Sequence, residues 1–187
     1  MRRDLYPIIE TDRLILRVPV QDDFEAGWAE FHGDEECMRY LGGAMPRSIA
    51  WRALAQVTGM WHLRGFGQFS AIEKGSGQWI GRVGAWLPED WPAAEVGWMV
   101  RRSAWGKGYA TEAARGCMDF VFGTLNWPFA AHLIHPDNAG SQSVAQRLGS
   151  QLIRTVTLPP PMNLAGDTQM WGQSAEQWQA AAGNRRL

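Results

Sequence analysis

The sequence predicts an α/β (α+β) protein with a single mixed, largely antiparallel central sheet of about seven strands flanked by about four helices. Alternating polar and apolar residues, as in the segment 8–19, are typical of strands. In the segment 110–121, small and apolar residues recur at the i, i+3, i+4, i+7, i+8 and i+11 spacing of an amphipathic helix. The order of these segments, β-α-α-β-β-β-α-β-α-β-β, is that of a mixed sheet covered by helices.

The individual elements follow from local patterns. After the first strand, a helix begins at residues 21–23, where two aspartates favour the helix dipole. A second helix runs from Pro46 to about Leu63, and the glycine-containing segment 74–78 is a hairpin turn. Further strands are expected at 67–73, 79–87, 94–100, 129–134, 151–158 and 168–171, and further helices at 110–123 and from 137–141 to Gly149. Residues 1–172 are expected to form a single domain, and residues 173–187 a peripheral C-terminal tail.

Composition excludes several classes of protein. A net charge of −1 argues against a nucleic-acid partner, which would demand a basic surplus. No segment approaches the ~20 apolar residues of a membrane span, and the N-terminus lacks the apolar stretch of a signal peptide. Cys37 and Cys117 form neither a disulfide framework nor a metal-ligand pattern. We therefore expect a cytoplasmic protein with no metal, no nucleic acid and no membrane partner.

A glycine-containing turn, Trp-Gly-Lys-Gly-Tyr-Ala at residues 105–110, joins an expected strand to the amphipathic helix. Gly106 and Gly108 let a ligand approach the backbone, and the first amides of a helix lack internal partners. With the helix dipole behind them, these amides can hold a pyrophosphate, and Lys107, Arg101 or Arg102 can add positive charge. The alternative is a turn that only caps a core helix. The spacing matches neither a Walker loop nor a dinucleotide-binding fingerprint.

Three blocks, in order, resemble the GCN5-related N-acetyltransferase (GNAT) superfamily, and most closely its RimJ/RimL-like branch. The first block is Glu-Thr-Asp-Arg-Leu-Ile-Leu-Arg at 10–17. The second runs from Ala-Glu-Val-Gly-Trp-Met-Val at 94–100 through the glycine turn to residue 113. The third is Asn-Ala-Gly-Ser-Gln-Ser-Val-Ala-Gln-Arg-Leu-Gly at 138–149. The resemblance covers residues 8 to about 158 and implies a GNAT-like fold.

The resemblance also implies acetyl-CoA as cosubstrate and assigns residues to it. The backbone of Met99 and Val100 would pair with the pantetheine arm, and an amide there would stabilise the thioester oxygen. Asn138 would bind the pantetheine or order the cleft, and Ser141 would lie near the thiol. The pyrophosphate would be held by the turn residues Trp105, Gly106, Lys107, Gly108, Tyr109 and Ala110.

This sequence departs from the family pattern at two points. Ser103 stands where relatives carry Gln or Arg, three residues before the first glycine. Many relatives use a C-terminal tyrosine as general acid toward the CoA thiolate, but here no tyrosine follows Tyr109. Ser141, Cys117 or a water molecule could supply the proton instead, although Cys117 falls on the buried stripe of its helix.

Glu95 is the expected general base for the amine, because strand alternation puts it on one face with Gly97 and Met99, beside the stretch that holds the arm. The alternative is a solvent-facing strand carboxylate. Trp28 and Phe31 are candidates for lining the acceptor cleft, or else core residues. The seven acidic residues between positions 22 and 36 could attract a cationic amine, or form a solvated helix face.

The expected function is transfer of an acetyl group from acetyl-CoA to a primary amine of a small molecule or a protein N-terminus, by direct attack in a ternary complex. The alternative is a catalytically impaired acyl-CoA-binding protein of the same fold, which the missing tyrosine supports. The eleven tryptophans favour a homodimer where they are exposed.

Overall fold

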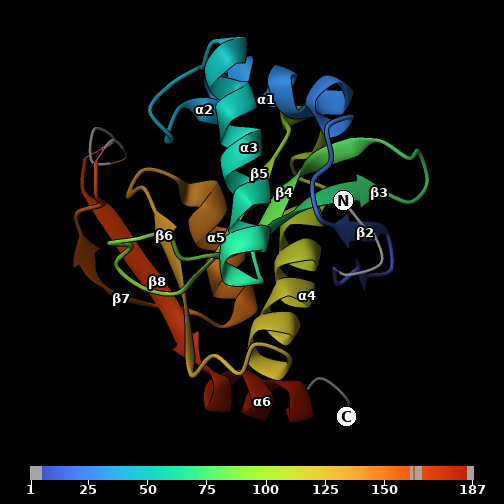
Figure 1. The fold of residues 1–187 in the computed structure, drawn as a ribbon. Helices are drawn as coiled ribbons and strands as arrows, with labels where there is room; N and C mark the ends of the chain where they lie inside the picture. Colours follow the sequence, from blue (N-terminus) through green and yellow to red (C-terminus); the bar gives the residue numbers. More distant parts are fainter. Residues whose placement is uncertain (1–5, 161, 163–165, 185–187) are drawn as a thin grey trace.

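The structure of the protein is a computed structural model that describes residues 6–160, 162 and 166–184. Within that part of the chain, one eight-stranded sheet has the order β1-β2-β3-β4-β5-β6-β8-β7, with helices on both faces (Figure 1). Every neighbouring pair is antiparallel except β5 and β6, so the expected mixed, largely antiparallel sheet is confirmed. The strands are β1 (Ile9–Glu10), β2 (Leu14–Arg17), β3 (Gln68–Glu73), β4 (Trp79–Trp86), β5 (Glu95–Val100), β6 (Phe129–Ile134), β7 (Gln151–Val156) and β8 (Thr168–Ser174).

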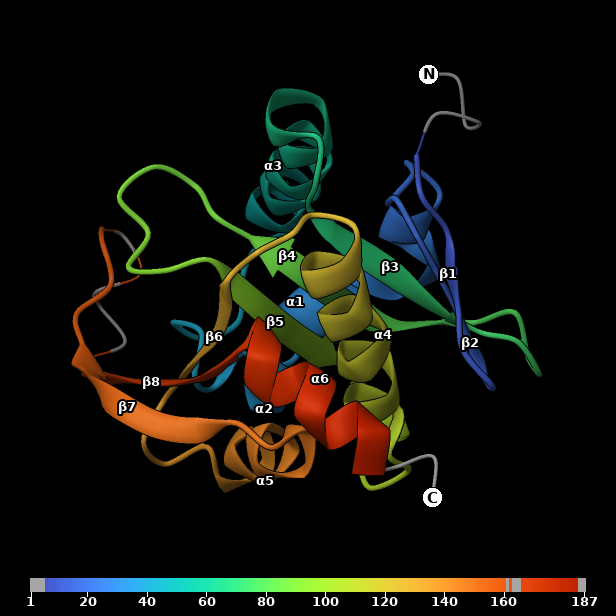
Figure 2. The same ribbon diagram turned by 90° about the horizontal axis from the view of Figure 1, so that it is seen from below.

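The helical segments divide between the two faces of the sheet. They are η2 (Phe24–Trp28, a π-helical turn), α1 (Ala29–Gly33), α2 (Glu35–Met38), α3 (Arg47–Arg64), η3 (Arg102–Ala104, a 3₁₀ turn), α4 (Tyr109–Gly123), α5 (Ala139–Leu148) and α6 (Ala175–Asn184). Figure 2 shows α3 on one side of the sheet and α5 on the other. Val83 and Val96 pack against the apolar stripe of α4 in the larger core, whereas Trp79 packs with η2, α1 and α3 in a second core. None of the described helices is both long enough and apolar enough to cross a membrane.

Two N-terminal elements differ from the expectation. The expected strand 8–19 is broken into β1 and β2, because Thr11 closes a tight turn with Leu14: the Thr11 amide donates to the Leu14 carbonyl at 3.0 Å, and the Leu14 amide donates to Thr11 Oγ1 at 3.0 Å. The expected helix from residue 21 is instead three short segments. Asp34 ends α1 in an extended conformation, and its side chain accepts a hydrogen bond from the Cys37 amide as the N-cap of α2.

The C-terminal residues that we expected to form a peripheral tail belong to the domain where they are described. β8 continues to Ser174 and leads directly into α6, which lies at the foot of α4 in Figure 1. Trp178 of α6 is only 3% exposed, lies in the larger core, and donates a hydrogen bond of 2.8 Å to Asp119 Oδ1 on α4. The sequence concealed this contact because one tryptophan in a short helix gives no apolar periodicity.

Candidate active site

A cavity of about 1370 Å³ follows the boundary between β5 and β6, which we call the seam. Its walls come from β5, from the loop and helix start at Trp105 to Arg115, and from the start of α5. The face of the sheet that bears Arg82 and the helical segments around His32 close its other end.

The seam exists because the two parallel strands separate almost at once. Only Glu95 and Ala131 are in register across it, although the Ala131 amide also donates to the Ala94 carbonyl at 2.8 Å. Next along β5, the Val96 carbonyl accepts a hydrogen bond of 2.7 Å from His132 Nδ1 rather than from a strand amide. Beyond Val96, β5 therefore presents backbone groups to the cavity that no strand pairs.

Strand alternation decides which groups these are, and it corrects the expectation for Met99. The Met99 carbonyl is directed at β4, where it lies 2.2 Å from the position that a Cβ on Gly81 would take. Because Val96 faces β6, the groups that face the seam beyond it belong to Trp98 and Val100. Trp98 is not among the residues predicted from the sequence, although strand alternation applied to the backbone groups identifies it.

The glycine turn has the geometry of an anion site. Gly106 and Gly108 have φ angles of 72° and 80°, a left-handed conformation that favours glycine. Among the described residues, no backbone carbonyl accepts from the amides of Gly106, Lys107 or Gly108. Gly108 is the N-cap of α4, so the first amides of that helix continue the same array.

The turn is fixed from behind by β2 and its preceding loop. Arg13 Nη1 donates to the Lys107 carbonyl at 2.9 Å, and Arg13 Nε donates to Glu112 Oε2 at 2.6 Å. Glu112 Oε1 also accepts from the Thr11 hydroxyl at 2.6 Å and from the Arg13 amide at 2.8 Å. The Arg13 guanidinium lies 4.3 Å from the centre of the Tyr109 ring, whose hydroxyl donates to Glu73. The Tyr109 hydroxyl is therefore directed away from the seam toward the end of β3.

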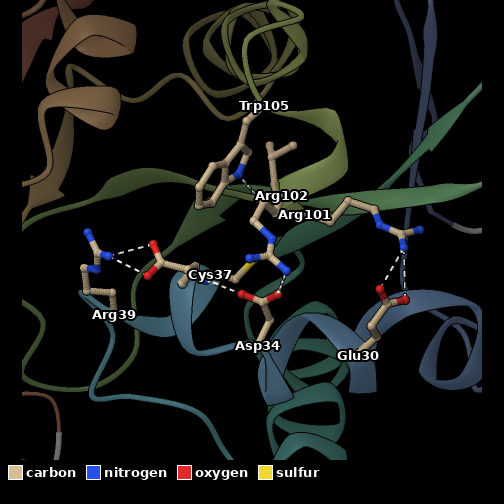
Figure 3. Close-up of polar contacts among 9 residues, drawn as sticks. Glu30, Asp34, Cys37, Arg39, Arg101, Arg102 and Trp105 are labelled. Carbon is tan, nitrogen blue, oxygen red and sulfur yellow. Dashed lines mark hydrogen bonds and ion pairs between the residues drawn. The ribbon is translucent and has the colours of Figure 1, made fainter.

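The basic residues beside the turn pair with the acidic run from the N-terminal helices (Figure 3). Arg101 Nη2 lies 2.9 Å from Glu30 Oε2, and Arg102 Nη2 lies 3.2 Å from Asp34 Oδ2. Both arginines are therefore held in ion pairs with Glu30 and Asp34, and the expectation that they add charge for phosphates stays a prediction. The Lys107 side chain is exposed at the turn, and its backbone carbonyl is held by Arg13.

Trp105 folds back over the end of β5. Its Nε1 donates a hydrogen bond of 2.6 Å to the Val100 carbonyl, and Figure 3 shows the indole above the Arg102–Asp34 pair. The Trp105 side chain is 47% exposed and lines the cavity. Since the Val100 carbonyl already has a partner, the unpaired seam-facing carbonyl on this stretch is that of Trp98.

The start of α5 lies across the seam. Asn138 caps this helix by accepting from the Ser141 amide at 3.0 Å, and the Ser141 hydroxyl accepts a hydrogen bond of 3.3 Å from Trp98 Nε1. Tyr40 also reaches this helix, because its ring stacks on His135 and its hydroxyl donates to the Asp137 carbonyl at 3.0 Å. Tyr40 thus places a tyrosine in this part of the cavity, although no tyrosine follows Tyr109 in the sequence. Only tertiary structure brings Tyr40 here.

Glu95 lies where the seam begins, and it is 8% exposed rather than solvent-facing. Oε2 accepts a hydrogen bond of 2.7 Å from Trp91 Nε1, and Oε1 accepts one of 3.4 Å from the Leu133 amide. Burial raises the pKa of Glu95 to about 7, against the opposing effects of these two hydrogen bonds and of the Arg82 charge. A carboxylate with such a pKa can exchange a proton near neutral pH.

The remaining candidates separate into cavity and core. Trp28 is fully buried, donates to the Ala50 carbonyl and does not line the cavity, so the expected acceptor contact is corrected to a core role. Phe31 is 3% exposed and contributes to the cavity wall. Cys117 is buried in the larger core, and burial raises the pKa of its thiol well above the usual range. In the described part of the chain, no three His, Cys, Asp or Glu side chains gather in a way that could hold a metal ion.

Several known proteins are similar to this chain in sequence, in fold or in both. Uncharacterized protein YkkB of Bacillus subtilis (strain 168) is 30% identical over 156 residues, which cover 78% of this chain and 86% of that protein. Uncharacterized N-acetyltransferase YoaA of the same organism is 29% identical over 152 residues, which cover 79% and 84%. The crystal structure of an acetyltransferase from Agrobacterium tumefaciens is 28% identical with a TM-score of 0.78, covering 89% of this chain and 94% of that chain.

A ribosomal-protein-S5-alanine acetyltransferase from Vibrio fischeri has a similar fold at 18% identity, with a TM-score of 0.71 over 92% of this chain and 98% of that chain. The sequence model of the acetyltransferase (GNAT) domain matches residues 13–151, well over half of the chain. The family that the three sequence blocks predict is therefore confirmed, and the chain belongs to the GNAT acetyltransferases.

Proposed function

We propose that the protein transfers an acetyl group from acetyl-CoA to a primary amine by direct attack in a ternary complex. One observation supports this proposal: the seam has a turn with unpaired backbone amides at one end and a buried carboxylate of raised pKa at the other. A pyrophosphate on the turn and a pantetheine arm along β5 would direct the thioester toward Glu95.

The cofactor contacts follow from the free backbone groups. The amides of Gly106, Lys107, Gly108 and the first turn of α4 would hold the pyrophosphate. The arm would pair with the seam-facing groups of Trp98 and the amide of Val100, and one of these amides would stabilise the developing negative charge on the thioester oxygen. Asn138 and Ser141 would border the thiol end from α5.

The chemistry needs a proton removed and a proton supplied. Glu95 would accept a proton from the ammonium form of the acceptor, and the freed amine would attack the thioester carbon. As the new C–N bond forms and the C–S bond breaks, the nitrogen of the new amide loses its second proton to solvent, and the leaving thiolate takes a proton. The hydroxyl that supplies this proton regains one from water. Ser141 remains the proposed donor, with Tyr40 as a second hydroxyl on the same side of the cavity.

Thiol release tests the proposal. The protein is incubated with acetyl-CoA and a panel of amino acids, polyamines, aminoglycosides and peptide N-termini, and free thiol is followed over time. We expect release with at least one amine, and a decrease of about 10²- to 10⁴-fold in kcat for Glu95→Gln with an unchanged Kd for CoA. Unchanged release by Glu95→Gln would remove Glu95 as the base. Tight CoA binding without release for any amine would instead indicate a binding protein.

A further inference from the structure

Arg82 is a half-buried cation without an anionic partner among the described residues, at the end of the cavity that the helical segments around His32 close. It lies on β4 opposite Met99 and lines the cavity wall. Nη1 donates a hydrogen bond to Gln68 Oε1, while Nε is buried with no partner among the described residues. Nη2 likewise makes no hydrogen bond to that part of the chain. Charged groups that are largely withdrawn from solvent are normally paired, so the unpaired, buried Nε of Arg82 needs an explanation.

The protein offers Arg82 little negative charge of its own. Burial lowers the pKa of Arg82 to about 10, and among the described residues only the Glu95 charge opposes this effect. The guanidinium is therefore protonated at neutral pH. It lies 5.2 Å from the centre of the buried Trp28 ring, a contact that supports its position but leaves its donors unsatisfied.

The neighbouring His32 adds no positive charge, so Arg82 is the cationic group at this end of the cavity, which we call the positive pole. His32 is fully buried, and burial together with the Arg82 charge lowers its pKa to about 4. Its Nδ1 lies 2.8 Å from the Trp28 carbonyl, which can only accept, so Nδ1 carries the proton and Nε2 is an acceptor without a partner among the described residues. His32 is thus neutral at pH 7 and adds no positive charge.

Gln68 connects this pole to the carboxylate. Gly84 and Gly97 lie in register beside Gln68, so that row of the sheet carries no other side chain. The position that a Cβ on Gly97 would take is 3.1 Å from Glu95 Oε1 and 3.2 Å from Gln68 Nε2. The Gln68 amide therefore lies between the Arg82 guanidinium on one side and the Glu95 carboxylate on the other. We call these three side chains the row.

We propose, on the basis of the proposed function, that the acceptor is a compact amino carboxylate, whose carboxylate binds Arg82 while its amine faces Glu95. A zwitterion matches the two poles of this row, and a guanidinium binds a carboxylate through two parallel hydrogen bonds. Apolar side chains of the second core, Met45, Val57 and Trp86, line the cavity beside Trp28, and Trp91 lines it next to Glu95; they favour an amino acid with an apolar side chain.

The experiment compares matched acceptors. Phenylalanine, leucine, methionine and tryptophan are each assayed beside their amide and their decarboxylated amine, together with a peptide that begins with the same residue. We expect kcat/KM for at least one free amino acid to exceed that of its amide by about 100-fold, mainly through KM. Equal or better turnover of the amides, amines or peptides would overturn the carboxylate proposal and leave the acetyl transfer standing.

Variants of Arg82 connect this preference to the residue. Arg82→Met is expected to reduce the ratio of acid to amide to about one, and Arg82→Lys to restore part of it, because lysine keeps the charge but loses the fork. Arg52→Met on the exposed face of α3 is the matched control and should keep the wild-type ratio. A wild-type ratio in Arg82→Met would overturn the assignment.

Two measurements separate this proposal from a structural role and from failure of the proposed function. Arg82→Met should unfold at the same temperature as wild type or higher, since an unpaired, half-buried charge is removed. A large loss of stability, with an unchanged acid-to-amide ratio in the folded fraction, would mark Arg82 as a packing residue. Calorimetry with N-acetylphenylalanine and its amide tests the carboxylate site without turnover: preference for the acid would support it even if no amine released thiol.

Discussion

Trp91 Nε1 donates a hydrogen bond of 2.7 Å to Glu95 Oε2, so a loop residue holds the charged form of the carboxylate that we propose as the base. Trp91 lies in the connection between β4 and β5 and lines the cavity. Burial raises the pKa of Glu95 to about 7, and this hydrogen bond is the foremost of the effects that limit the rise.

Removing the Trp91 hydrogen bond should move the pH profile. In Trp91→Phe the charged form of Glu95 loses a donor, so we expect the acidic limb of kcat/KM to shift upward by about one pH unit. Both proteins are assayed with the same acceptor, which cancels the ionisation of the amine. Trp51→Phe, at an exposed site on α3 outside the cavity wall, is the control. A limb that stays in place in Trp91→Phe would show that Glu95 does not govern it.

Glu112 should matter for the cofactor rather than for the chemistry. Glu112→Gln weakens the contacts to Thr11 and Arg13, and Arg13 also holds the Lys107 carbonyl of the glycine turn. We expect KM for acetyl-CoA to increase about fivefold with kcat nearly unchanged, a modest effect because Arg13 is half-exposed. Steady-state kinetics at saturating acceptor measure it. Arg64→Ala, which removes an exposed pair with Glu89, provides the comparison; a fall in kcat alone in Glu112→Gln would contradict the positioning role.

Acid should destabilise the fold through its buried imidazoles. Burial lowers the pKa of His132 from 6.5 to about 4, so the unfolded chain binds its proton at a higher pH than the folded chain does. The stability contributed by neutral His132 is complete above pH 6.5 and is lost as the pH falls toward 4, by about 3 kcal/mol.

Urea unfolding at pH 7 and pH 4.5 measures this dependence. His132→Gln should be less stable than wild type at pH 7, because His132 bonds both Val96 and Ser150, but should lose less stability between the two pH values. His62→Gln, at an exposed position, should keep the wild-type dependence. Identical slopes for wild type and His132→Gln would mean that His132 titrates normally in the folded protein.

The last helix should be required for folding. Trp178→Ala empties a site in the larger core and is expected to lower the free energy of unfolding by about 3 to 5 kcal/mol. Trp51→Ala, at a 48% exposed side chain, should change it by less than about 0.5 kcal/mol. Chemical denaturation of the two variants gives the comparison. Equal free energies of unfolding for Trp178→Ala and Trp51→Ala would indicate that residues 173–187 form a peripheral tail after all.

Periodic patterns in the sequence were sufficient for most of the fold. The apolar stripe at Ala113, Ala114, Cys117 and Val121 predicts α4, and the glycine turn before it predicts the helix start. Two features of the fold were not predicted, each because its sequence signal is local and weak. The turn at Thr11–Leu14 depends on side-chain hydrogen bonds that interrupt an otherwise regular alternation, and α6 packs through a single large side chain.

Residues of the candidate site could be selected from the sequence where they lie in or beside a predicted strand, but not where their role depends on tertiary contacts. Gly106, Gly108 and Glu95 could be chosen from their place beside a strand. Arg82 could not be chosen in this way, because its proposed role depends on its contacts with Gln68 on β3 and Trp28 on η2. Its one local signal is a charged residue within an apolar strand, between Gly81 and Gly84.

The seam has a mechanical consequence. β1–β5 and β6–β8 form two leaves that share one register pair in the middle of the sheet, Glu95 with Ala131, where other neighbouring strands share several. A pantetheine arm between the leaves would hydrogen-bond to β5 as a neighbouring strand does. The acetyl donor would therefore also stabilise the contact between the two halves of the sheet. Amide exchange at Trp98 and Val100 should slow when CoA is added, and the enzyme should be most rigid at the moment that it is loaded to react.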